Sequence, residues 1–154
     1  MNTEQALSPV EIRLKRLSPR SVLPRRGSDL AAGYDIYACL DEPLTIPPHA
    51  TAAVGAGFAA ALPEGWFAAI FARSGLAARR GLRPANCVGV CDADYRGEYI
   101  VPLHNDSDTP QTVEPGERIA QMILLPCREL RFREVEELED TERGAGGFGS
   151  TGRQ

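Results

Sequence analysis

The sequence has little lysine, little histidine and no long apolar segment. Lys15 is the only lysine among 17 basic residues, and all the others are arginines. No glycine precedes Lys15, so the glycine-rich phosphate loop that ends in Gly-Lys-Ser/Thr is excluded. The longest apolar stretch, 52–62, has 11 residues, whereas a helix that spans a membrane needs about 20. We therefore expect no membrane partner.

Cysteine is also scarce, and its spacing does not suit a structural metal. The four cysteines stand at positions 39, 87, 91 and 127, with no CxxC pair. Cys87 and Cys91 are the closest two, but on one strand they would lie about 13 Å apart, too far to share an ion. The first 16 residues are polar and charged and contain no signal-peptide core. We expect free thiols in a cytoplasmic protein.

An excess of positive charge is missing as well. The formal net charge is −4, so a generic nucleic-acid-binding protein is not indicated. A GC-rich genome would explain the preference for arginine over lysine. Arginine nevertheless presents a planar fork that binds two phosphate oxygens, so the surroundings of individual arginines carry the functional information.

Glycine and proline, by contrast, are abundant. The 154 residues include 15 glycines and 12 prolines, which penalise helix interiors and suit short strands joined by turns. The segments 85–91 and 98–103 are expected to form a hairpin around 92–97, and 75–80 is the best helical candidate. The other expected strands are 11–17, 34–39, 43–48 at an edge, 66–72, 118–125 and 129–138.

Turns recur about every ten residues, a spacing typical of an all-β sandwich, jelly roll or barrel. Residues 1–142 are expected to form a single β domain. The composition changes after Glu142, because five of the nine residues from 144 to 152 are glycine. Such a segment cannot bury enough surface to order itself, so we expect 143–154 to be a flexible tail.

Two glycine patterns match the dinucleotide-binding fingerprint but lack its context. The Gly-x-Gly-x-x-Ala pattern at 55–60 is soon followed by Pro63, which prevents the helix that the motif requires. The second pattern, 144–149, lies five residues from the end of the chain. Ser74 lacks the flanking glycines of a nucleophile elbow, and the chain has only two histidines. A Ser–His hydrolase is therefore not indicated.

Polar residues interrupt several apolar strands, and each has a structural explanation beside a functional one. Asp35 would accept hydrogen bonds in a turn, and Gln121 needs a partner within its apolar strand. Arg96 and Glu98 would form a surface ion pair. The other candidates are 73–75, between strand and helix; Asp92, Asp94 and Tyr95, in the expected hairpin; and Arg143, Ser150 and Thr151, around the glycine tail.

Together these positions resemble the trimeric dUTPase (deoxyuridine 5′-triphosphate nucleotidohydrolase) family along nearly the whole chain. Five motifs follow the order of that family: 32–36 (AGYDI), 73–76 (RSGL), 89–98 (GVCDADYRGE), 116–121 (GERIAQ) and 143–152 (RGAGGFGSTG). The third and fifth are the most specific. The chain departs from the family pattern at Cys91, where an aliphatic residue is common, and at Tyr99 and Pro102.

The resemblance implies an all-β fold, a distorted jelly-roll-like β-barrel with one short helix, in a homotrimer whose active sites lie between subunits. It implies hydrolysis of dUTP to dUMP and diphosphate, with Mg²⁺ as cofactor. This reaction keeps uracil out of DNA and supplies dUMP for thymidylate synthesis. Motifs one, two and four would come largely from one subunit, motif three from a second and motif five from a third.

The resemblance also implies roles for single residues. Asp92 would accept a proton from the water that attacks the α-phosphorus, a task that suits a carboxylate. Asn86 would read the uracil edge, and Tyr95 would pack on the deoxyribose and exclude a 2′-hydroxyl. Asp35 would reach Mg²⁺ through water. The α- and β-phosphates would be bound by Arg73, Ser74, Gly75 and Gln121, and the tail would close as a lid through Arg143, Phe148, Gly149, Ser150 and Thr151.

Two alternatives stay open from the sequence. A dCTP deaminase shares the fold, but it needs a general base, expected to be a glutamate, near the pyrimidine amine. The hairpin motif and the Phe-bearing tail fit that enzyme less well. A non-catalytic protein that uses the nucleotide to gate a regulatory surface is the second alternative, although intact Asp92, Arg73 and Arg143 argue against a loss of catalysis.

Overall fold

The structure is a computed structural model that describes residues 9–147. The chain consists mostly of strands, with a single helix in this range, α1 (Ser74–Arg80). This seven-residue helix ends where Gly81 takes a left-handed conformation, with φ 66°. No helix between residues 9 and 147 is long and apolar enough to cross a membrane. The strands are β1 (Arg13–Arg16), β2 (Arg25–Arg26), β3 (Tyr34–Tyr37), β4 (Leu44–Ile46), β5 (Thr51–Gly55), β6 (Phe58–Ala61), β7 (Trp66–Phe71), β8 (Leu82–Pro84), β9 (Val88–Cys91), β10 (Ile100–Asn105), β11 (Gln111–Val113) and β12 (Arg118–Pro126).

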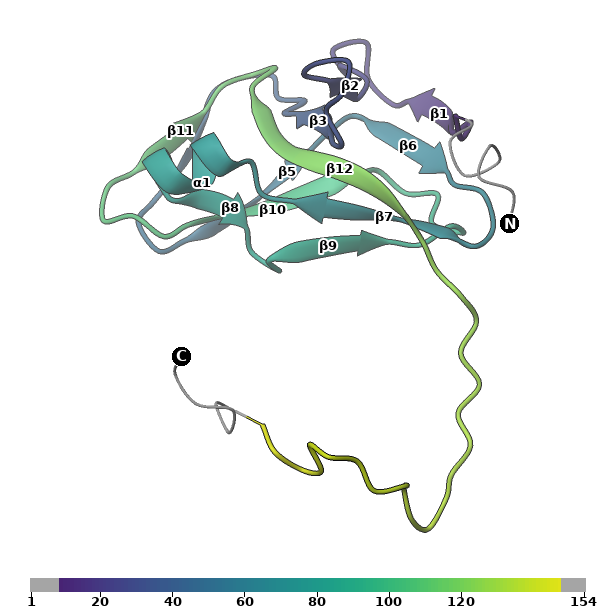
Figure 1. Ribbon diagram of the computed structural model, residues 1–154. Coiled ribbons are helices and arrows are strands. Elements are labelled where there is room, and N and C mark those ends of the chain that lie inside the picture. The colour runs from purple at the N-terminus through teal and green to yellow at the C-terminus, as the bar shows by residue number, and fades with distance from the viewer. Residues whose placement is uncertain (1–8, 148–154) are drawn as a thin grey trace.

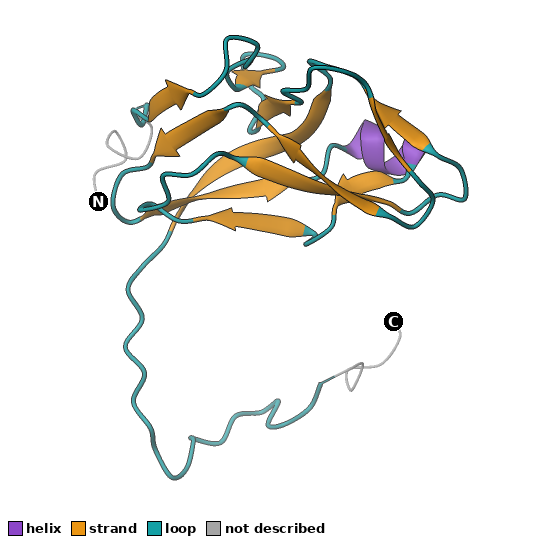
Figure 2. Cartoon of the chain, turned by 180° about the vertical axis from the view of Figure 1, so that it is seen from behind, coloured by secondary structure: helices purple, strands orange, loops and turns teal. Residues whose placement is uncertain are grey.

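The strands pair antiparallel and form separate ladders. The largest sheet has the order β2-β3-β12-β7-β9, and a second sheet has the order β5-β10-β8. Two further ladders pair β1 with β6 and β11 with β4. Figure 1 shows α1 at the opposite end of the body from β1, and Figure 2 shows how strands dominate the fold. The expected all-β jelly-roll class is confirmed, although the barrel is not closed.

Both larger sheets contribute to one hydrophobic core. In β10, Val101 and Leu103 are buried, whereas Pro102 and His104 are more exposed, as expected for a strand with one face on the core. Both glycines of the 55–60 pattern lie at the bend between β5 and β6, so that segment is not helical. The fully buried apolar side chains include Ile36, Ile46, Val54, Phe58, Leu82, Leu103, Val113 and Ile119.

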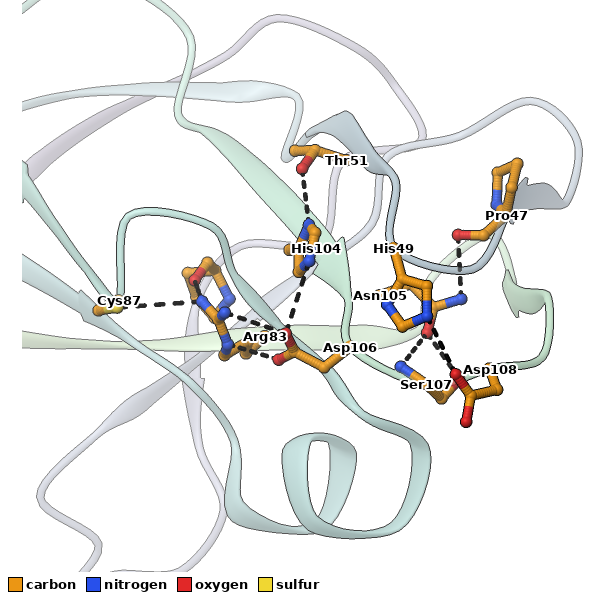
Figure 3. A network of polar contacts seen from close by, with 11 residues as sticks. Pro47, His49, Thr51, Arg83, Cys87, His104, Asn105, Asp106, Ser107 and Asp108 are labelled. Carbon is orange, nitrogen blue, oxygen red and sulfur yellow. Dashed lines mark hydrogen bonds and ion pairs between the residues drawn. The ribbon is translucent and has the colours of Figure 1, made fainter.

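A polar network surrounds Asn105, the fully buried last residue of β10. Its amide nitrogen donates to the carbonyls of Ile46 (3.0 Å) and Pro47 (3.1 Å). Figure 3 shows that both histidines belong to this network: His49 contacts Asp108 at 3.0 Å, and His104 lies between a threonine and an aspartate. These contacts join β4, β5, β8 and β10, so the histidines serve a structural network.

The predicted hairpin of 85–91 with 98–103 is wrong in its pairing. β9 pairs with β7, where Cys91 stands opposite Ala68, whereas β10 pairs with β5 and β8. The reason is that β10 already pairs with β5 and β8, whereas β7 offers β9 a half-buried to buried apolar strand for cross-strand contact. The edge position predicted for 43–48 is confirmed, because β4 has β11 as its single partner among the described strands.

The predicted strand at 129–138 is not formed. Residues 127–147 contain no strand, and the chain leaves the body after β12 (Figure 1). Leu130 and Phe132 are 71% and 93% exposed. Their alternation indicates extended chain, but a strand also needs a hydrogen-bonding partner, and no described strand pairs with this segment. Five strands were missed. β2, β8 and β11 have two or three residues, too few to show a period. β5 and β6 lie in a run of small apolar residues and glycines that does not alternate with polar ones.

Candidate active site

A cavity of about 200 Å³ lies between β9 and β10. Asn86, Asp92 and Tyr95, three of the predicted site residues, line it together. Asp92 follows β9 directly and is exposed. Its carboxylate forms no ion pair with any residue between 9 and 147, so it is free to bind a water molecule or a ligand.

The cavity walls include strand edges that lack hydrogen-bonding partners on one side. Among the described strands, β9 lies at the edge of its sheet and pairs with β7 alone. β10 pairs with β5 from Ile100 to His104 but with β8 only from Leu103 to Asn105. Backbone donors and acceptors on the open edges are therefore available to a ligand. In the predicted hairpin, β9 and β10 would have paired with each other. Because they diverge instead, a cavity lies between them.

Local hydrogen bonds hold the turn after β9, which carries Tyr95. The backbone N–H of Tyr95 donates to the Asp92 carbonyl (3.2 Å), and its phenol donates to the Glu98 carbonyl (2.9 Å). The guanidinium of Arg96 donates to the Ala93 carbonyl (2.7 Å). Arg96 therefore stabilises the turn itself, in place of the surface ion pair with Glu98 that was one alternative from the sequence.

Cys91 and Tyr99, two of the departures from the family pattern, lie together in the cavity wall. Burial, and then the charge of the neighbouring Asp92, raise the pKa of the Cys91 thiol. Burial and the nearby Cys91 raise the pKa of Tyr99. The Tyr99 hydroxyl is buried without a hydrogen-bond partner among the described residues, and its ring stacks on Phe58 with centroids 4.9 Å apart. The raised pKa values keep the Cys91 thiol and the Tyr99 phenol beside Asp92 protonated at neutral pH.

A second cavity, of about 640 Å³, lies where β3, β7 and β12 meet α1. β12 runs between β3 and β7, and its register places Gln121 opposite both Asp35 and Phe71. Three motifs that are far apart in the sequence therefore meet on adjacent strands. The predicted residues that line this cavity are Asp35, Arg73, Ser74, Gly75 and Gln121.

Asp35 is nearly buried and binds two guanidinium groups. Nε of Arg73 donates to its Oδ1 (2.8 Å), and Nη1 of Arg118 donates to its Oδ2 (3.2 Å). Because Asp35 holds Arg73 through Nε, the terminal nitrogens of Arg73 remain available to a ligand. Arg118 was not predicted as a site residue. Arg118 could have been predicted, because it lies within the fourth motif and begins an apolar strand.

The polar side chain of Gln121, which lies in an apolar strand, has a hydrogen-bond partner. Its Nε2 donates to the carbonyl of Ala72, the residue that follows β7 (2.9 Å). A Cβ on Gly33 would lie 2.6 Å from Oε1 of Gln121, so only glycine leaves room for this side chain. Gln121 thereby joins the first motif to the second.

The second cavity is positively charged although the chain as a whole is acidic. Its lining holds four arginines and two carboxylates, those of Asp35 and Glu117. Arg80 pairs with Glu117, and Arg79 has no acidic partner within residues 9–147. An excess of positive charge in a cleft attracts anions such as phosphate. Arg79 and Arg80 were missed, although both stand in the last turn of the expected helix.

Part of the predicted site is not brought together. Arg143 lines neither cavity, and its Nε donates to the Gly146 carbonyl within the tail (2.8 Å). Among the described residues, none lines both cavities, and no histidine lines either one. The part of the chain that the structure describes offers no group of three or more metal-ligating side chains. Phe148, Gly149, Ser150 and Thr151 lie outside the described residues.

Comparison with known proteins gives a consistent family. The family model described as dUTPase matches residues 20–152. The deoxyuridine 5′-triphosphate nucleotidohydrolase of Coxiella burnetii (strain RSA 493 / Nine Mile phase I) is 46% identical over 140 residues, which are 90% of this chain and 92% of that protein. The protein of the same name from Idiomarina loihiensis is 42% identical over 150 residues, covering 96% of this chain and 99% of that one.

Similar solved structures are also dUTPases. A variant of the Staphylococcus bacteriophage 80alpha dUTPase with dUpNHpp has a TM-score of 0.81 at 27% identity, over 93% of this chain and 99% of that chain. The residues matched by the family model contain all five motifs. The relatives are named as hydrolases of deoxyuridine triphosphate, so the deaminase alternative is not favoured. With its motifs gathered around two cavities of an open jelly roll, this chain belongs to the dUTPase family.

Proposed function

We propose that this chain hydrolyses dUTP to dUMP and diphosphate by in-line attack of water on the α-phosphorus, with Asp92 as the base. The observation that carries the proposal is the exposed Asp92 carboxylate, which lines the first cavity and has no cationic partner among the described residues. An unpaired carboxylate can orient a water molecule and accept its proton. The family and the names of the relatives support this reaction. Its product is the dUMP from which thymidylate is made, and its substrate is removed before uracil enters DNA.

The first cavity would hold the nucleoside. The open edges of β9 and β10 provide backbone donors and acceptors for the uracil edge, and Asn86 adds a side-chain amide. A site built from such fixed groups discriminates against cytosine, because mismatched donors and acceptors stay unpaired. Tyr95 would pack on the deoxyribose and leave no space for a 2′-hydroxyl.

The second cavity would hold the phosphates. Arg73, anchored by Asp35, presents its terminal nitrogens, and Ser74, Gly75 and Gln121 line the same space. Charge neutralisation and positioning are the main contributions that a protein makes to phosphoryl transfer. The positive excess of this lining supports the assignment.

Enzymes of this family use a divalent metal ion, and we propose that it is Mg²⁺. The described residues offer no protein cage for a metal, and both Asp35 oxygens accept hydrogen bonds from arginine. This donor set fits Mg²⁺, which usually keeps several waters and takes few carboxylates. Asp35 would therefore contact the ion through water. When bound, Mg²⁺ neutralises charge on the phosphate oxygens.

We also propose a homotrimer with shared active sites. dUTP carries its nucleoside and its phosphates in one molecule, yet no residue between 9 and 147 lines both cavities. Two half-sites from different subunits would complete the pocket. Arg143, Phe148, Gly149, Ser150 and Thr151 would then close over it from a third subunit. The cytoplasmic location stays a prediction.

The decisive experiment is Asp92→Asn. The variant should bind the non-hydrolysable analogue dUpNHpp within about threefold of the wild type, because the amide keeps the shape of the carboxylate, but it cannot take up the proton. We expect kcat to fall by far more than tenfold. A tenfold fall corresponds to about 1.4 kcal/mol of activation free energy. Diphosphate release and calorimetric titration measure the two effects.

Asp94→Asn is the matched control, because Asp94 lies in the same turn without lining either proposed half-site. A kcat for Asp92→Asn within about tenfold of the wild type would contradict the role of the base. Release of diphosphate from dUTP, with none from dCTP and no ammonia, would separate hydrolysis from deamination. A non-catalytic regulator would release neither product.

A further inference from the structure

The Gly-x-Gly segment at the bend between β5 and β6 holds a carboxylate of the protein itself. The backbone N–H of Gly57 donates to Oε1 of Glu98 (2.8 Å). Glu98 is half-buried, and it lies in the third motif, which also carries Asp92 and Tyr95. The pattern that resembles a nucleotide-binding fingerprint in the sequence therefore binds an acidic side chain of the candidate site.

Both glycines are required for this contact. A Cβ on Gly55 would overlap Oε1 of Glu98, so a larger residue would expel the carboxylate. Gly57 has a φ of 69°, in the left-handed region that favours glycine. The bend is thus shaped to let the Glu98 carboxylate approach the backbone.

Backbone hydrogen bonds reinforce the contact. Ala56 donates to the Tyr99 carbonyl (2.9 Å), and Tyr99 donates to the Phe58 carbonyl (2.9 Å). Together with the Glu98 side chain, they fasten the end of the third motif to the bend. Most of the other residues of the turn, from Asp92 to Gly97, are polar or glycine, and these three bonds join the end of the turn to the bend.

The fastened segment in turn holds Tyr95. The phenol of Tyr95 donates to the carbonyl of Glu98 (2.9 Å), and a Cβ on Gly97 would overlap the Tyr95 hydroxyl. The rings of Tyr95 and Tyr99 are 6.2 Å apart and tilted by 53°. The position of the Tyr95 ring therefore depends on where the Glu98 backbone is held.

We propose that Glu98 is a positioning residue for sugar selectivity. Its carboxylate, bound to the bend at 55–57, fixes its own carbonyl, and that carbonyl fixes the Tyr95 ring against the deoxyribose. This inference rests on the proposed role of Tyr95 in excluding a 2′-hydroxyl. Loss of the carboxylate should let the ring move and admit UTP, even though Glu98 does not touch the reacting phosphate.

The test compares kcat/KM for dUTP with kcat/KM for UTP. Glu98→Ala and Gly55→Ala should each lower this ratio by about tenfold, the usual size of discrimination by shape alone. Glu98→Gln should keep the ratio within about twofold, because its amide oxygen still accepts the Gly57 N–H. Glu42→Ala, which removes an exposed carboxylate of similar charge, should leave the ratio unchanged.

Tyr95→Phe tests the inference even if the alanine variants fail to fold. It deletes only the hydrogen bond to Glu98 and should also lower the ratio. A loss of stability alone would lower both rates together and leave their ratio unchanged, and that outcome would overturn the inference.

Tyr95→Ala separates this inference from the proposed function. If Tyr95→Ala lowers the ratio but Glu98→Ala, Gly55→Ala and Tyr95→Phe do not, the role of Glu98 is wrong and that of Tyr95 stands. If Tyr95→Ala leaves the ratio unchanged, the selectivity role of Tyr95 fails and the inference fails with it.

Discussion

At the scale of residues, two aspartates show how surroundings separate chemical roles. Asp35 is nearly buried, and two guanidinium groups hold its carboxylate in place. Asp92 is exposed and has no such partner among the described residues. The first is suited to anchoring Arg73 and attracting a hydrated cation, and the second to exchanging protons with water.

The raised pKa of Cys91 gives a prediction for thiol chemistry beside Asp92. A raised pKa keeps the thiol protonated, and only the thiolate is nucleophilic. In a Cys87→Ser/Cys127→Ser background, which removes the two exposed thiols, alkylation of Cys91 by iodoacetamide should be slow at pH 7. The rate should rise by about tenfold for each pH unit until the pH passes the pKa. Mass spectrometry of the Cys91 peptide measures the rate.

Asp92→Asn in the same background provides the control. The Asp92 charge is one cause of the raised pKa, so its removal should move the rate profile to lower pH. Fast alkylation of Cys91 at pH 7, or a profile that does not depend on Asp92, would contradict the interpretation. Since Cys91 lines the first cavity, alkylation should also inactivate the enzyme.

At the scale of elements, β12 and the pair β9 and β10 decide where the site forms. β12 lies between β3 and β7 and brings three motifs to one cavity. β9 pairs away from β10 and leaves a second cavity between them. The segment after β12 makes no strand in the described residues, so its alternating apolar residues do not contribute to the core of this chain.

Deletion of residues 143–154 tests the lid. The truncated protein should keep its thermal unfolding midpoint, because the two larger sheets end before this segment. We expect kcat/KM for dUTP to fall by about a hundredfold or more, since misplacement of positioning groups costs that much. Unfolding by circular dichroism and diphosphate release measure the two effects.

A shorter deletion, 153–154, leaves all the predicted lid residues in place and should retain activity. Wild-type turnover from the protein that lacks 143–154 would contradict the lid. A large fall in its unfolding midpoint would show that the segment supports the fold instead.

At the scale of the whole molecule, local charge outweighs net charge. The chain carries a formal charge of −4, yet four arginines face two carboxylates in the second cavity. Electrostatic attraction of a phosphate depends mainly on charges within about a Debye length, roughly 8–10 Å at physiological salt. An acidic protein can therefore hold a triphosphate where its arginines gather.

Mixing two inactive variants tests the shared site. Asp92→Asn subunits lack the proposed base, and subunits without 143–154 lack the proposed lid, so each variant alone should be inactive if the proposed trimer forms. If each site draws these parts from different subunits, random mixed trimers should recover about a quarter of wild-type activity. Sedimentation checks the assembly, and diphosphate release follows the activity.

The outcome depends on subunit exchange, which refolding the mixture from denaturant provides. Mixing each variant with itself gives the baseline. Trimers that stay inactive after verified exchange would contradict active sites shared in this way.

The sequence by itself determined the strand-rich class, the short helix before Gly81 and the residue types of the site. These features depend on local chemistry: glycine and proline limit helices, and motifs of adjacent residues remain adjacent when the chain folds. Asp92 and Tyr95 in one turn, and Arg73 at the start of α1, were predictable for this reason.

The tertiary structure alone decided which strands became neighbours. The placement of β12 between β3 and β7, the separation of β9 from β10 and the capture of Glu98 by the 55–57 bend all join residues far apart in the chain. The same holds for Arg118 on Asp35 and for the unpaired 129–138 segment. Strand pairing follows from competition among all available edges and from burial of side chains in a common core, and a local pattern contains neither.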